Sequence, residues 1–85
     1  MSRFRVSVNI SPRQGILDPQ GKAVADALHS LEFAEVRDVR IGRFVVIQVD
    51  ASDSATASQR VREMCEKLLA NPVIEDFDIA SVEES

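Results

Sequence analysis

The chain has 85 residues, a formal net charge of −4 and apolar side chains at 45% of its positions. A chain of this length folds as one domain and buries only about 60 to 65% of the surface that its unfolded form exposes, so a deep catalytic cleft is hard to build. The acidic balance disfavours nucleic acid as a partner, and the composition excludes a disordered tail or a fibre. No apolar run approaches the roughly 18 to 20 residues that cross a bilayer. We therefore expect one cytoplasmic domain over residues 1–85, with neither nucleic acid nor membrane as a partner.

The first half of the chain begins with a strand pattern and continues with a helix pattern. Residues 3–10 alternate apolar and polar side chains, which is typical of a strand with one buried face. Over residues 19–31 the apolar positions recur at helical spacing and form one stripe. Asp18 can cap the first free amides of this helix, and Pro19 suits its first position.

Three further segments complete the pattern. Two runs rich in β-branched residues flank Gly42 and predict a hairpin. A longer segment of helical period ends at Asn71-Pro72, because proline disfavours helical geometry in the residue before it. The predicted elements are strands over 36–41 and 44–49, a helix over 54–70 with Ala57, Val61, Met64 and Leu68 on its apolar stripe, and a strand over 74–81.

This order, βαββαβ, predicts an α+β, ferredoxin-like sandwich in which a four-stranded antiparallel sheet carries both helices on one face. Right-handed crossovers would place the first and third strands in the middle. The third strand is apolar on both faces, whereas a strand with one solvated face alternates. Because the helices cover only one face, we predict that Phe44 and Val46 form a self-association surface on the other; packing at a sheet edge would also explain them.

The stretch GILDPQGKAV, residues 15–24, contains a Gly-Lys pair and is a candidate phosphate-binding loop. Such a loop requires Gly-x4-Gly-Lys-Ser/Thr, in which the amides wrap the phosphates and the hydroxyl holds magnesium. Here five residues separate Gly15 from Gly21, and Ala23 stands where the hydroxyl is needed. The stretch is better explained as the start of a helix.

No set of catalytic, cofactor-binding or metal-binding residues emerges. His29 and Cys65 are the only residues of their kinds, and each lies in a predicted helix, so neither a nucleophile-base set nor a zinc site is indicated. Cys65 lies beside an apolar stripe and is expected in the core. An RNA-binding third strand would need several aromatics where only Phe44 is present. An acylphosphatase would need a glycine-flanked loop around Arg13, which this sequence lacks.

Three blocks of the sequence resemble the small subunit of phosphoribosylformylglycinamidine synthase, the PurS family. They are GILDPQGKAVADALHSLEF, VRDVRIGRFVVIQV and MCEKLLANPVIEDFDI, and together they run through nearly the whole chain. The resemblance implies a single PurS-like domain that is a noncatalytic subunit of a ligase of de novo purine biosynthesis. That ligase converts formylglycinamide ribonucleotide, glutamine, water and ATP to formylglycinamidine ribonucleotide, glutamate, ADP and phosphate.

The resemblance also implies partners. In the family a glutaminase subunit makes ammonia with its own cysteine, a large synthetase subunit uses ATP with magnesium, and PurS copies pair as a homodimer or tetramer and bridge the two. No cofactor is expected on this chain. In the exposed loop before the first helix, Pro12, Arg13 and Asp18 are the candidate partner contacts.

Two positions depart from the family pattern. Glu32 stands where the family usually has a glycine after the first helix, and a glutamate in the left-handed conformation would cost roughly 1 kcal/mol. Arg13 replaces the usual lysine, which keeps the charge but changes the donor geometry. An ACT-like domain that senses a small metabolite at a dimer interface is the alternative function.

Overall fold

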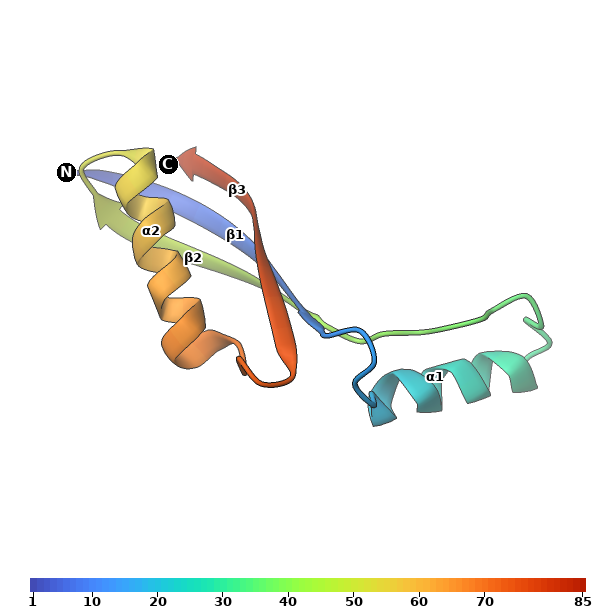
Figure 1. The fold of residues 1–85 in the computed structure, drawn as a ribbon. Helices are drawn as coiled ribbons and strands as arrows, with labels where there is room; N and C mark the ends of the chain where they lie inside the picture. Colours follow the sequence, from blue (N-terminus) through green and yellow to red (C-terminus); the bar gives the residue numbers. More distant parts are fainter.

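A computed structural model describes residues 1–85, which form an antiparallel sheet, two helices and a short π-helical turn (Figure 1). The three strands are arranged in the order β2-β1-β3. The elements in chain order are β1 (Ser2–Pro12), α1 (Pro19–Ser30), β2 (Arg43–Ala51), α2 (Ser54–Met64), the π-helical turn Cys65–Leu69, and β3 (Glu75–Glu84). The α+β class and the antiparallel sheet with two helices are therefore confirmed.

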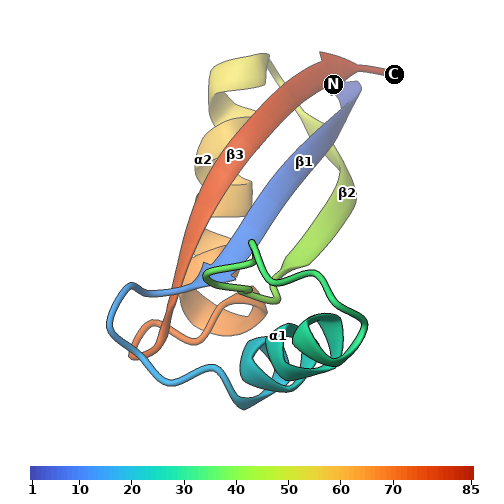
Figure 2. The same ribbon diagram turned by 90° about the vertical axis from the view of Figure 1, so that its right-hand side faces the viewer.

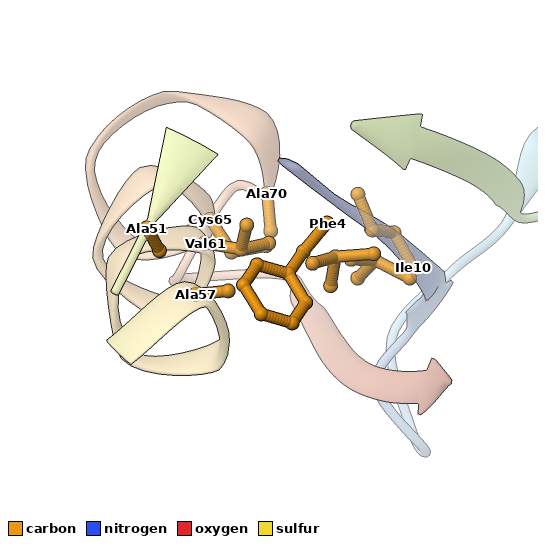
Figure 3. Packing of buried hydrophobic residues seen from close by; sticks show 9 residues of the cluster. Phe4, Ile10, Ala51, Ala57, Val61, Cys65 and Ala70 are labelled. Carbon is orange, nitrogen blue, oxygen red and sulfur yellow. The ribbon is translucent and has the colours of Figure 1, made fainter. Parts of the chain in front are cut away.

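The core lies between the sheet and α2, and the alternating strand β1 provides most of it. From Phe4 to Ile10 every second residue of β1 is buried on the side of the sheet that α2 covers, and β1 is flanked by strands on both sides. The buried side chains pack together as Figure 3 shows. They are Phe4, Val6, Val8, Ile10, Ala51, Ala57, Val61, Cys65 and Ala70.

Helix α2 is held by a capping aspartate and buries residues four apart. The Asp53 carboxylate accepts a hydrogen bond of 2.8 Å from the N–H of Thr56. The predicted stripe is wrong at Leu68, whose side chain is 83% exposed. The reason is the π-helical turn, in which the N–H of Ala70 bonds to the carbonyl of Cys65 at 3.0 Å, so that the wider spacing turns Leu68 outward. Neither α1 nor α2 has the length and apolar character needed to cross a membrane.

The segment 36–41, predicted as a strand, is not one, and the sheet has three strands where four were predicted. The segment continues the line of β2 away from the sheet instead of turning back at Gly42 (Figure 1). A Cβ atom at Gly42 would lie 2.3 Å from the carbonyl oxygen of Ile10, so the backbone passes tightly beside the end of β1 here. As a result β2 is an edge strand, whereas the prediction placed it in the middle.

Contacts with the chain before α1 keep this segment in its place. The N–H of Ile41 donates to the Asp18 carboxylate at 2.8 Å. The guanidinium of Arg40 donates to the carbonyl of Pro12. The sequence pattern of a strand gives no sign of these two long-range bonds. They form where the predicted hairpin would have paired residues 36–41 with β2.

Helix α1 does not cover the sheet, which corrects the prediction of two helices on one face. Residues 13–42, here called the arm, comprise α1 and the segments before and after it. The arm stands away from the sheet and α2, and the chain is 52 × 26 × 14 Å in extent (Figure 1). Figure 2 shows α2 along one face of the sheet and α1 beyond the end of the strands. Of the α1 residues, only Gly21 is buried.

Candidate functional site

Asp18, one of the predicted partner contacts, holds the two sides of the arm together. One carboxylate oxygen accepts from the N–H of Gly21 at 3.1 Å, which confirms the predicted helix cap. The other accepts from the N–H of Ile41. The pKa of Asp18 is lowered, chiefly by the Ile41 N–H and then by the Gly21 N–H, because both bonds favour the charged carboxylate. The ionised carboxylate of Asp18 is therefore the form that the contacts from both sides of the arm favour.

Pro12 and Arg13, the other predicted partner contacts, lie where the arm leaves the sheet. The N–H of Arg13 bonds to the carbonyl of Ile74 at 2.8 Å, and its guanidinium lies 3.3 Å from Asp76. A groove of about 450 Å³ between the arm and the ends of the strands is lined by Pro12 and Asp18 but not by Arg13. The structure thus brings two of the three residues to one groove and places Arg13 beside an acidic side chain of β3. Their contact with a partner stays a prediction.

Phe44 and Val46, the predicted self-association residues, lie on the face of the sheet opposite α2. Their side chains are 62% and 49% exposed, while the residues between and after them pack against the core. In the strand register they stand beside Asn9 and Ser7 of β1. Phe44 and Val46 are the large exposed apolar side chains of the strands, and both belong to the edge strand β2. Self-association through Phe44 and Val46 stays a prediction.

A second feature of the strand ends, which sequence reasoning missed, is the ion pair of Arg43 with Glu75. Both terminal guanidinium nitrogens of Arg43 lie 2.9 Å from the carboxylate, and one also donates to the carbonyl of Leu69 at 2.8 Å. The N–H of Asn71 donates to the same carboxylate at 2.8 Å. The pKa of Glu75 is lowered, first by the Arg43 hydrogen bonds and then by the Asn71 N–H. The sequence does place opposite charges at the starts of two predicted strands. This signal predicts an ion pair only once it is known that both strands flank β1.

The two side chains considered for chemistry are far from a catalytic arrangement. Cys65 is fully buried in the core, and this burial raises the pKa of its thiol, which disfavours the reactive thiolate. His29 lies on the arm, where its Nε2 is 2.7 Å from the carbonyl oxygen of Val36. No three His, Cys, Asp or Glu side chains gather closely enough to hold a metal ion. What the structure offers is a set of exposed surfaces.

Comparison with known proteins identifies the family. The sequence model of the PurS family, described as phosphoribosylformylglycinamidine (FGAM) synthase, matches residues 5–83. The phosphoribosylformylglycinamidine synthase subunit PurS of Bacillus subtilis (strain 168) is 50% identical over 74 residues, which cover 87% of each chain.

Solved structures give the same result. A crystal structure of Bacillus subtilis PurS is 49% identical and superposes with a TM-score of 0.84 over 95% of this chain and 99% of that one. A chain in the structure of PurLQS from Thermotoga maritima is 28% identical and superposes with a TM-score of 0.83 over the whole of both chains. Because these superpositions span so much of the chain, they include the arm. The chain belongs to the PurS family.

Proposed function

We propose that this chain bridges the glutaminase and the ATP-dependent synthetase subunits of phosphoribosylformylglycinamidine synthase in de novo purine biosynthesis. Bridging would let glutamine-derived ammonia be used to amidate formylglycinamide ribonucleotide. The observation that carries the proposal is the full-length match to a chain of the Thermotoga PurLQS structure. The chain has exposed surfaces and no nucleophile-base pair, which agrees with a subunit that acts by binding other subunits.

On this proposal the chemistry is carried by the other subunits. ATP and magnesium would bind to the synthetase subunit, and this chain would hold no cofactor. The groove lined by Pro12 and Asp18, together with Arg13 beside β3, is the proposed contact with one of the two partners. The ACT-like sensor receives no comparable support, because the comparisons match the PurS family.

The chain is also proposed to act as a homodimer or tetramer. The exposed pair Phe44 and Val46 supports self-association through the face of the sheet opposite α2. Self-association through this face would leave the groove between the arm and the strand ends free for other partners.

Reconstitution tests the bridging role. The purified chain is combined with the glutaminase and synthetase subunits of the same enzyme, and amidation is measured with glutamine and with ammonium chloride as alternative nitrogen sources. We expect removal of the chain to abolish glutamine-dependent amidation and to spare more of the ammonium-dependent reaction. Equal rates from glutamine with and without the chain would show that it is no bridge.

A further inference from the structure

A second cavity lies within the arm itself, between α1 and the segment 36–41 that follows it. These two limbs of the arm run side by side (Figure 1) and are joined at both ends. Near the start of α1 the Asp18 carboxylate accepts from the N–H of Ile41 at 2.8 Å. Near its end the Nε2 of His29 lies 2.7 Å from the carbonyl oxygen of Val36. The cavity between the limbs has a volume of about 540 Å³, which is within the range of pockets that bind small molecules.

The cavity uses the face of α1 that lies opposite its apolar stripe. Lys22, Asp26 and His29 line it, each four or three positions after the one before, so they share one helical face. Val24 and Leu28 of the stripe stand two positions after Lys22 and Asp26, and residues two apart in a helix do not face the same way. Any contact that covers the apolar stripe would therefore leave the cavity open.

Three carboxylates line the cavity, and two of them are already engaged. Asp18 accepts from two backbone N–H groups. Asp26 lies 3.2 Å from the ammonium group of Lys22. Asp38 is the one carboxylate of the cavity that has no hydrogen bond or ion pair within the chain. Little negative charge is thus left to oppose an anion there.

The cavity has more free donors than free acceptors. The guanidinium of Arg37 lines it without a partner in the chain, and that of Arg40 bonds to a carbonyl and to no carboxylate. On the third side, in the loop before α1, the N–H groups of Gly15 and Leu17 donate no hydrogen bond within the chain. Arginine side chains bind phosphate and carboxylate groups in a two-pronged geometry. This is a local excess of donors in a chain whose net charge is −4.

We propose that the cavity between the limbs of the arm binds a small sugar phosphate. A phosphate group has three strong acceptor oxygens that point in different directions, so it can bond to Arg37, Arg40 and the loop amides together, whereas a carboxylate is planar with two oxygens. A carbonyl only accepts, so His29 donates from Nε2 to Val36, and in the neutral ring its Nδ1 is an acceptor for a hydroxyl group of the sugar. The ligand would thus be held at its phosphate and at its sugar.

Titration of the isotope-labelled full chain, followed by the NMR shifts of its backbone amides, tests the site. The probe is glucose 6-phosphate, and glucose and inorganic phosphate each lack one half of it. We expect saturable shifts at Gly15, Leu17 and Lys22 with a Kd on the order of 1 mM, at least about threefold weaker binding of inorganic phosphate and none of glucose. The absence of saturable shifts at these residues, equal binding of inorganic phosphate, or tighter binding of citrate, which carries carboxylates alone, would overturn the proposal.

Two pairs of substitutions separate this cavity from a general effect of charge. Arg37→Ala should weaken binding at least about tenfold, whereas Arg60→Ala on α2 removes the same charge away from the cavity and should leave it unchanged. Asp38→Asn removes the unengaged carboxylate and should tighten binding about threefold, whereas Asp78→Asn on β3 should not.

The gain expected for Asp38→Asn cannot come from a loss of folding. Equal effects within either pair would show that glucose 6-phosphate responds to net charge alone, and would overturn the proposal. These measurements use the chain alone, so their failure would leave the proposed bridging role untouched.

Discussion

Replacing Arg43 with alanine is the sharpest test of what joins the strand ends. The substitution removes two hydrogen bonds to Glu75 and one to the carbonyl of Leu69. Hydrogen bonds to charged groups contribute about 1.5–3 kcal/mol when buried. The Arg43 side chain is 52% exposed and that of Glu75 only 13%. Solvent screening on the arginine side therefore reduces our expectation to about 1–2 kcal/mol in the free energy of unfolding.

Arg60→Ala is the matched control, because Arg60 forms an exposed pair with Glu63 on α2 at 3.0 Å. Such a pair contributes only about 0.5 kcal/mol or less. Thermal unfolding at one fixed protein concentration should therefore place Arg43→Ala roughly 5–15 °C below the unsubstituted chain and Arg60→Ala within a few degrees of it.

The difference should also depend on pH with a defined sign. The pKa of Glu75 is lower in the folded chain than its ordinary value of 4.5, so its ionisation contributes stability that is fully present above pH 4.5 and is lost as the pH falls through the folded pKa. The gap between the native chain and Arg43→Ala should thus be constant near neutral pH and shrink in acid. Equal melting temperatures for Arg43→Ala and Arg60→Ala, or a gap that persists unchanged in strong acid, would refute the reasoning.

Three other substitutions or reagents probe separate features. Phe44→Glu should lower the mass of the associated chain on a sizing column, because it places an unpaired charge at the proposed contact, whereas Gln48→Glu further along the strand should not; equal elution would move the interface elsewhere. Glu32 has φ of 73°, so Glu32→Gly should raise the free energy of unfolding by about 0.5–1 kcal/mol in urea denaturation, and a loss of stability would contradict strain there. Cys65 should react with a thiol reagent at least about tenfold faster after denaturation, because burial now protects it; a fast reaction in the native chain would argue against that burial.

Local signals in the sequence were sufficient to predict the elements that are determined by residues close together in the chain. The alternation around Val6 predicted the buried face of β1, and the Asp18-Pro19 pair predicted the start of α1. The family resemblance pointed to Glu32 as a place where the exit of α1 could differ from the family's glycine turn, and Glu32 adopts the left-handed conformation that suits glycine. In each case the residues that decide the structure lie within a few positions of one another.

The rest could not be predicted because it depends on contacts between distant residues. The pattern at 36–41 predicted a strand, and this prediction is wrong because β-propensity does not specify a pairing partner and the segment pairs with no strand of the chain. The second bond of Asp18, to Ile41, crosses 23 positions and holds that segment off the sheet. Likewise, the apolar stripe of α1 predicts packing against the sheet, but it does not show that α1 stands away from the sheet and buries only Gly21.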